Sequence, residues 1–236
     1  FREISSIQLS RQRPMIGDGV YSLSEVSRYT GIAAATVRSW FKPRSDHTGL
    51  GPLFEADYRP VGNDFAVSFL NLVERYVARY FRVHGVKAWR IRRVYAAVQL
   101  DLNSPHPFAR QDLFTDGIDI FRRVGESVDD PEIVDVLTRP RQRVFGKWCD
   151  YLGRFDYANK TIRRWHIAAG IVIDPQVSFG KPIIQSTGIT TYVLANQYHA
   201  NKRNAALVAD LFAVEEQDVL RAVDFETRAV SMRSAA

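Results

Sequence analysis

The sequence predicts a mainly α-helical chain with a small α/β section in its middle. Apolar residues recur at helical spacing over residues 65–98 and again over 191–225, the pattern of helices that bury one face. Between these stretches, Asp116-Gly117 stands between apolar runs and favours a β-hairpin. We therefore expect three regions: an N-terminal helical region at 1–100, a small α/β region at 101–168, and a C-terminal three-helix region at 169–236.

Residues 21–41, YSLSEVSRYTGIAAATVRSWF, have the spacing of two short helices joined by a glycine turn. Ser22 and Ser24 are both candidate N-caps, because a serine hydroxyl accepts a hydrogen bond from a free backbone amide. Gly31 can adopt the left-handed conformation that ends a helix without steric cost. The side of the second helix that we expect to be buried carries Val37, Trp40 and Phe41. Together these features form a helix-turn-helix pattern.

The other side of the second helix carries small, hydrogen-bonding or cationic residues: Ala34, Thr36, Arg38 and Ser39. Small residues allow a helix to approach the DNA major groove closely, and an arginine reaches phosphates or guanine edges. The alternative is an ordinary helical hairpin whose polar face is only solvated. The pattern alone does not separate the two.

The same stretch resembles the start of the MerR-type winged helix, through its E-V-S-R, T-G-I and T-V-R-S-W strings. In that family the threonine, the arginine and the aromatic residue that ends the second helix face the DNA backbone, which implies this role for Thr36, Arg38 and Trp40. Residues 49–59, rich in glycine and proline, suit the hairpin wing of such a fold. Further candidate phosphate contacts are Lys42, Arg44 and Arg59, with plain surface charge as the alternative. The effector-sensing coiled coil of MerR activators is not visible downstream, so the resemblance does not imply inducer sensing.

Positive charge is concentrated in the first hundred residues of a chain whose net charge is +6. Residues 65–100 alone contain seven Lys or Arg against Glu74. A polyanionic partner is therefore expected to meet the N-terminal end of the molecule.

The stretch from Phe65 to Phe81 is predicted to form one long helix, capped by Asn63 or Asp64, with a broad aromatic stripe. A second helix is predicted to begin near Lys87, after a break at His84-Gly85. The stripe favours a core or a homodimer interface, and a second DNA-facing unit is the alternative. We expect Tyr76 and Tyr80 to contribute to the dimer. Arg75, Arg79 and Arg82 are expected to share another face of the first helix, and Arg90 and Arg93 to point outward from the second.

Nothing in the sequence indicates an enzyme. The five histidines are scattered without metal-ligand spacing, and no nucleophile, phosphate-loop or dinucleotide motif is present. Asp112, Asp116 and Asp119 lie close together, but a turn and a solvated face explain them better than a metal site. We expect no catalytic residue, no metal and no cofactor. The single cysteine, Cys149, and the lack of an apolar run of transmembrane length favour a cytoplasmic protein without membrane contact.

The middle region is predicted to contain the hairpin at Asp116-Gly117, a strand at 133–136, a helix at 144–152 and a strand at 161–167. After it, I-V-I-D-P, G-K-P-I-I and S-T-G-I resemble the opening of the DUF433-like family, a three-helix, helix-turn-helix-like unit found in antitoxins. The family's usual arginine is absent from the last string. The helices expected there span residues 191–198, 201–212 and 215–225.

The combination of these parts, with P-H-P-F and F-T-D-G in the middle region, resembles one subgroup of VapB-type antitoxins along nearly the whole chain. The resemblance implies a protein that binds its own operator DNA and inhibits a PIN-domain ribonuclease toxin. It also implies that a basic residue in the tail beyond Phe225, either Arg228 or Arg233, contacts this partner. We expect the tail to be polar and mobile, and the protein to be a homodimer. A stand-alone transcriptional regulator is the alternative, and a ribonuclease gene beside this one would discriminate between them.

Overall fold

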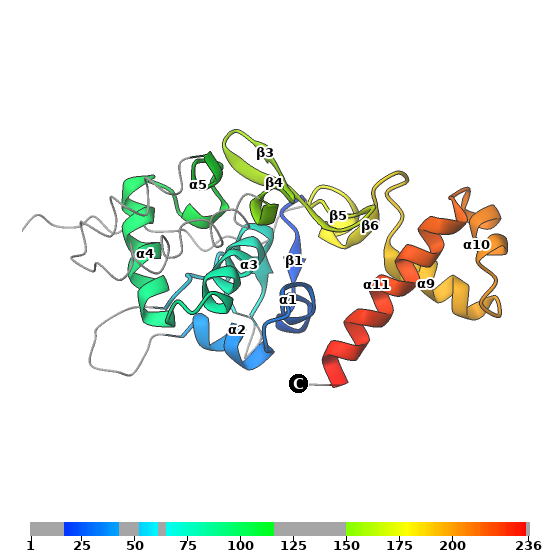
Figure 1. Ribbon diagram of the computed structural model, residues 1–236, viewed down its shortest axis with the longest axis horizontal. Coiled ribbons are helices and arrows are strands. Elements are labelled where there is room, and N and C mark those ends of the chain that lie inside the picture. Colours follow the sequence, from blue (N-terminus) through cyan, green and yellow to red (C-terminus); the bar gives the residue numbers. More distant parts are fainter. Residues whose placement is uncertain (1–16, 43–51, 61–64, 116–149, 235–236) are drawn as a thin grey trace, which may run out of the picture.

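The computed structural model describes residues 17–42, 52–60, 65–115 and 150–234. Within these ranges the protein is mainly helical and contains two small antiparallel sheets, as the sequence predicts. Figure 1 shows the N-terminal helices at one end of an elongated molecule and the three C-terminal helices at the other. None of the helices in these ranges is both long enough and apolar enough to cross a bilayer.

The N-terminal elements are β1 (Val20–Tyr21), α1 (Leu23–Thr30), α2 (Ala34–Trp40), β2 (Val67–Ser68), α3 (Phe69–Val83), α4 (Ala88–Asp101), the 3-10 turn η1 (Pro107–Ala109) and α5 (Asp112–Thr115). The C-terminal elements are β3 (Phe155–Ala158), β4 (Thr161–Ala168), β5 (Ile171–Ile173), the 3-10 turn η2 (Ser178–Gly180), β6 (Pro182–Ile184), α9 (Thr191–Ala200), α10 (Ala205–Phe212) and α11 (Glu216–Ser234).

The first two helices form as predicted. Ser22 caps α1 in a capping box, because its hydroxyl accepts from the Glu25 amide while the Glu25 carboxylate accepts from the Ser22 amide. Ser24, the other candidate cap, lies inside the helix. Gly31 ends α1 with φ +68° and donates its amide to the Ser27 carbonyl over 2.8 Å. On α2, Val37, Trp40 and the following Phe41 are buried.

The long helix begins later than predicted. Residues 67–68 pair with β1 as an extended strand, with Val20 opposite Ser68 and Tyr21 opposite Val67. Ser68 then caps α3 by accepting from the Asn71 amide over 3.1 Å, so the expectation that Asn63 or Asp64 caps the helix is wrong. Phe65 lies outside the helix. Helical periodicity did not reveal this boundary, because the pairing of β2 with β1 depends on residues almost fifty positions away.

The aromatic stripe of α3 is covered by the chain itself. The Tyr76 ring stacks on Tyr151 with centroids 4.3 Å apart and lies 4.5 Å from Trp165. Tyr80 also contacts Tyr151, at 4.7 Å. Because both tyrosines are buried by these partners, the expectation that they form a dimer surface is wrong. The stripe is broad because α3 packs on two sides, against the helices and against the β3–β4 hairpin.

The second helix of this pair agrees with the sequence. The break falls at His84 and Gly85, α4 begins after Lys87, and its apolar stripe is buried. Arg90 and Arg93, expected to point outward from α4, are half-buried, and Arg82 of α3 is exposed. Arg92 of α4 is also buried.

The larger sheet has the order β3-β4-β5-β6, with every pair antiparallel, and it crosses residue 168, where the middle region was expected to end. The strand predicted at 161–167 is confirmed as β4, with Trp165 opposite both Phe155 and Ile173. The hairpin at 116–117, the strand at 133–136 and most of the helix at 144–152 lie outside the described residues. Leu113 and Phe114, expected to precede the hairpin as a strand, are helical in α5.

The three C-terminal helices pack around their own apolar core, which includes Leu194, Val208 and Val219. Asn204 caps α10 by accepting from the Leu207 amide over 3.0 Å, so this helix starts later than the expected residue 201. Helix α11 continues to Ser234. The residues beyond Phe225, expected to form a mobile tail, are therefore helical as far as Ser234, and Arg228 pairs with Asp224 one turn earlier.

Arg75, expected on a face of α3 other than the aromatic stripe, lies in the centre of the N-terminal core and is 0% exposed. Its guanidinium carbon lies 4.0 Å from the centroid of the Phe41 ring and 4.7 Å from that of Phe54. Nη1 donates to the Asn71 carbonyl oxygen over 2.6 Å. Burial lowers the pKa of Arg75 to about 10, although the neighbouring Glu74 opposes this shift, so the group stays cationic at neutral pH. Arg75 therefore forms a cation–π sandwich that joins α3 to the end of α2.

Replacing Arg75 by alanine is expected to lower the free energy of unfolding by about 3 kcal/mol, because it leaves a cavity between two rings and removes the cation–π contacts. Arg75→Met, which refills most of the volume without a charge, is expected to lower the free energy of unfolding by less. Urea unfolding monitored by circular dichroism measures both. An Arg75→Ala protein as stable as the wild type would mean that the sandwich contributes nothing.

Candidate nucleic-acid interface

The outer face of α2 is open to solvent. Ala34, Thr36 and Ser39 are exposed on it, Arg38 is half-buried, and Lys42 is exposed just after the helix. Four of these residues lie on one short helix and the fifth closely follows it, and all five carry small or cationic side chains. Such a surface can enter a groove of a nucleic acid without steric hindrance.

Two of the other predicted contacts lie elsewhere, and one is outside the described residues. Trp40 is only 6% exposed and its ring packs 5.7 Å from Phe54, so its side chain belongs to the core rather than to the outer face. Arg59 is exposed on the segment 52–60. Arg44 lies outside the described residues.

The expected wing is not found in the part of the chain that the structure describes. Residues 52–60 contain no paired strands apart from a single bridging residue at Tyr58. Leu53 and Phe54 point into the core, and the Phe54 amide donates to the Trp40 carbonyl over 3.2 Å. This segment therefore packs behind α2 and supports it. The remainder of the expected wing, residues 49–51, lies outside the described residues.

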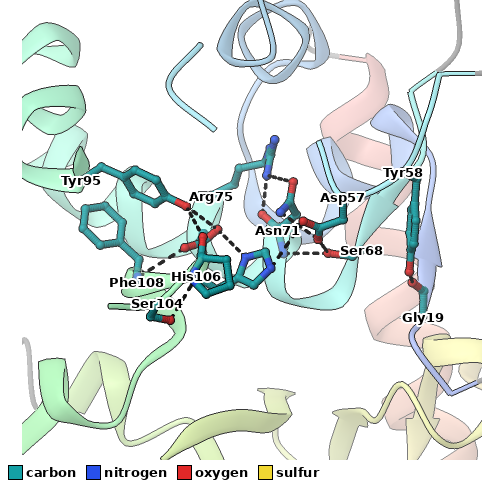
Figure 2. Close-up of polar contacts among 12 residues, drawn as sticks. Gly19, Asp57, Tyr58, Ser68, Asn71, Arg75, Tyr95, Ser104, His106 and Phe108 are labelled. Atoms are coloured by element: carbon teal, nitrogen blue, oxygen red, sulfur yellow. Dashed lines mark hydrogen bonds and ion pairs between the residues drawn. The ribbon is translucent and has the colours of Figure 1, made fainter. Parts of the chain in front are cut away.

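A polar network connects residues 52–60 to α3 (Figure 2). The Asp57 carboxylate accepts hydrogen bonds from the Ser68 hydroxyl and from the Asn71 side-chain amide, the latter over 3.0 Å. Asn71 in turn accepts from Arg75 through both its backbone and side-chain oxygens. The network thus connects the 52–60 segment to the N-terminus of α3 and to the Arg75 sandwich.

Glu74 and His106 continue the network on the other side of α3. Glu74 is fully buried and accepts from the Tyr95 hydroxyl at 3.1 Å, His106 Nδ1 at 3.1 Å and the Phe108 amide at 3.3 Å. His106 Nε2 lies 3.4 Å from Asp57 Oδ1. Burial lowers the pKa of His106, but the carboxylates of Glu74 and Asp57 raise it by more, so the net pKa is above its ordinary value.

Little in the sequence indicates this network. In the sequence, Glu74 is the single acid among seven basic residues, and His106 is one of five scattered histidines. The available signal was the position of an acid on the apolar stripe of α3, because a buried carboxylate requires hydrogen-bond donors. Its donors come from residues 21 to 34 positions further along the chain, and the sequence does not reveal that proximity.

Two ion pairs connect helix α1 to the C-terminal part of the chain. The Lys181 ammonium pairs with Glu25, the acid of the capping box, and Arg28 pairs with Glu226 of α11. Burial raises the pKa of Glu25, but its bonds with Lys181 and Ser22 lower it by more, giving a net decrease. Figure 1 shows α11 running alongside α1. The helix-turn-helix pair is therefore held in a fixed orientation to the C-terminal helices.

A glycine is required where the two parts meet. The Tyr21 hydroxyl donates to the Gly180 carbonyl over 3.0 Å, and a Cβ on Gly180 would lie 2.2 Å from that hydroxyl oxygen. Gly180 also has φ +76°. A larger residue at this position would push η2 away from β1.

The expected partner contacts lie on the last turns of α11. The Arg228 side chain is exposed and bridges to Asp224 over 2.9 Å, one helical turn earlier. Arg233 lies in the same helix, directly before its last residue, Ser234. Both positions are therefore carried on a helix instead of a loose tail.

A pocket of about 360 Å³ lies between α4 and residues 52–57. Its lining is largely apolar, with Asp57 and His106 among its polar members. Asp112, one of the three clustered acids, pairs with Arg110 over 2.9 Å, and Asp116 and Asp119 lie outside the described residues. In the described ranges, no group of three His, Cys, Asp or Glu side chains is arranged to hold a metal ion.

Comparisons with known proteins support the C-terminal resemblance. Residues 171–225 match the family described as a protein of unknown function, DUF433. A curated protein of Mycobacterium tuberculosis (strain ATCC 25618 / H37Rv), named "Putative antitoxin VapB45", is 29% identical over 223 residues, which cover 87% of this chain and 92% of that protein. The crystal structure of Rv2018 from M. tuberculosis is similar with a TM-score of 0.69 at 25% identity, over 86% of this chain and 96% of that one.

The stabilising effect of His106 is expected to depend on pH. Because its folded pKa is raised, its contribution is fully present below the ordinary value of 6.5 and is lost as the pH rises through the higher folded pKa. The stability difference between wild type and His106→Gln should therefore shrink from about pH 6 to about pH 8.5 in urea unfolding. The exposed His199→Gln serves as the matched control, with little difference at either pH. A wild-type to His106→Gln difference that is constant over this range would contradict the protonated contact.

Proposed function

We propose that this protein is a DNA-binding antitoxin of a toxin–antitoxin system, which binds its own operator and neutralises a PIN-domain ribonuclease. The observation that carries the proposal is the similarity to an antitoxin-named protein over 87% of the chain. The match of residues 171–225 to DUF433 supports it, since the sequence resemblance connects this unit with antitoxins.

The operator-binding part of the proposal rests on the exposed face of α2. A MerR-like helix-turn-helix places its second helix in the major groove. The small Ala34, Thr36 and Ser39 allow close approach, while Arg38 and Lys42 can bind phosphates or base edges. Arg59, exposed on the neighbouring segment, and Arg44 are proposed as further phosphate contacts. The positive excess of the first hundred residues favours a polyanion at this end.

The toxin-binding part rests on the C-terminal helices. These have their own core, and α9 and α10 lie at the end of the molecule opposite to α2 and α4, whereas α11 reaches back to α1 (Figure 1). Arg228 and Arg233 near the end of α11 are proposed to contact an acidic nuclease site. We further propose a homodimer, because helix-turn-helix proteins commonly bind two-fold-symmetric half-sites. Its contact must lie outside the α3 stripe, which the chain already covers.

Charge reversal at Arg38 tests the operator-binding part. Arg38→Glu is expected to weaken binding to DNA from upstream of the gene by at least about tenfold, because it removes a contact of about 1–3 kcal/mol and adds repulsion. The slope of log affinity against log salt concentration is expected to decrease in magnitude by about one unit. Fluorescence anisotropy at several salt concentrations measures both quantities.

The matched control is Arg163→Glu, which reverses the same charge at an exposed position on β4. It should leave operator affinity close to wild type. Unchanged binding by Arg38→Glu would exclude α2 from the interface, and failure of the wild type to bind any upstream DNA would contradict an operator-binding function.

A further inference from the structure

Helix α10 is apolar on both of its faces. Of its eight residues, AALVADLF, only Asp210 is polar. Ala205, Val208 and Ala209 point into the C-terminal core, as one face of an amphipathic helix would. The opposite face is also apolar, and its leucines are exposed in the part of the chain that the structure describes. A helix that is apolar all round is expected to be buried on all sides.

The uncovered face is formed by two leucines one helical turn apart. Leu207 is 42% exposed and Leu211 is 61% exposed. Residues four apart lie above one another on a helix, so the two side chains form a continuous ridge. Single exposed apolar residues are ordinary on protein surfaces, whereas a ridge of large ones indicates an interaction site.

Charges of opposite sign stand at the two ends of this ridge. Lys202 and Arg203 precede α10, and Glu215 and Glu216 follow it; all four are exposed. Over the described ranges, none of these four side chains takes part in an ion pair. The surface is thus basic at one end, apolar in the middle and acidic at the other.

We propose that this surface of α10 pairs with the same surface of a second copy of the chain, with the two helices antiparallel. A two-fold axis at the level of residue 209 places Leu207 of one copy against Leu211 of the other. The same symmetry brings Arg203 close to Glu215 and Lys202 close to Glu216 across the interface. A two-fold interface requires such self-complementarity, and the spacing of these six residues supplies it.

One residue opposes this pairing. Asp210 is exposed and lies one position from the axis, so the two copies of its carboxylate would lie near each other. It stands beside the leucine ridge rather than on it, and the apolar contact remains complete. Neutralising this residue is therefore expected to strengthen the association.

The location of α10 leaves the other surfaces free. Figure 1 places it at the end of the molecule remote from α2, beyond α9 and α11. Two copies joined here would keep both nucleic-acid faces accessible. The inference rests on the homodimer included in the proposed function and supplies the surface for it, but it requires neither DNA nor a toxin.

Sedimentation velocity of the full chain over a concentration series tests the pairing. The wild type is expected to dimerise, and the double variant Leu207→Glu, Leu211→Glu to raise the dimer dissociation constant by at least about a hundredfold, since four leucines lose their contacts. Asp210→Asn should lower that constant. Leu100→Glu, at an equally apolar and more exposed position on α4, is the matched control and should leave it unchanged.

Exchanging the charges of one pair distinguishes the antiparallel arrangement from non-specific hydrophobic association. Arg203→Glu alone and Glu215→Arg alone should each weaken the dimer about fivefold to tenfold at low salt, and the two changes combined should restore it, because each pair is then re-formed with its signs exchanged. A combined variant weaker than either single one would overturn the antiparallel arrangement.

Three further results would overturn the inference and leave the proposed function distinguishable from it. If the wild type stays monomeric, or if the leucine double variant dimerises normally, α10 is not the dimer surface, while operator binding can still hold. If the double variant remains as the wild type in sedimentation but no longer binds the purified product of the neighbouring gene, the occupant of α10 is that protein and not a second copy.

Discussion

The burial of a single guanidinium group organises the N-terminal half of this protein. Arg75 lies between the rings of Phe41, which ends α2, and Phe54, which belongs to the segment behind it. A cation without water must be stabilised by its neighbours, and here two aromatic faces and the oxygens of Asn71 do so. Because α2 carries the candidate nucleic-acid face, the orientation of that face depends on a residue buried on a different helix.

The carboxylates around Arg75 extend this constraint to the rest of the domain. Glu74 and Asp57 together hold His106, and through it the turn that follows α4. Buried charges are costly when a partner is removed, so such a network favours one arrangement of its helices over slightly shifted ones. Ion pairs of Glu25 with Lys181 and of Arg28 with Glu226 then connect α1 to the C-terminal part of the chain. A partner that displaces α11 would therefore act directly on the helix-turn-helix pair.

The apolar stripe of α3 is buried within the chain, whereas the outer apolar face of α10 is exposed, and the elements next to each surface explain the difference. The stripe on α3 is wide enough for a second copy, but Tyr151, which precedes β3, and Trp165 of β4 cover it. The outer face of α10 belongs to a helix of only eight residues, yet its two leucines stay exposed in the described chain. The width of an apolar stripe in the sequence is thus a poor guide to oligomerisation. It indicates that the helix face is buried, but not whether the same chain or a second copy covers it.

The sequence by itself determined the local structure: the Ser22 cap, the Gly31 stop, the buried side of α2, the break at His84 and the order of the C-terminal helices. Each of these depends on backbone geometry and side-chain spacing within a few residues. Only the tertiary structure decided the start of α3, the burial of Arg75, and the Glu74–His106 contact. These are set by residues tens of positions apart, where the free energy of burying a group depends on which partners the fold brings to it.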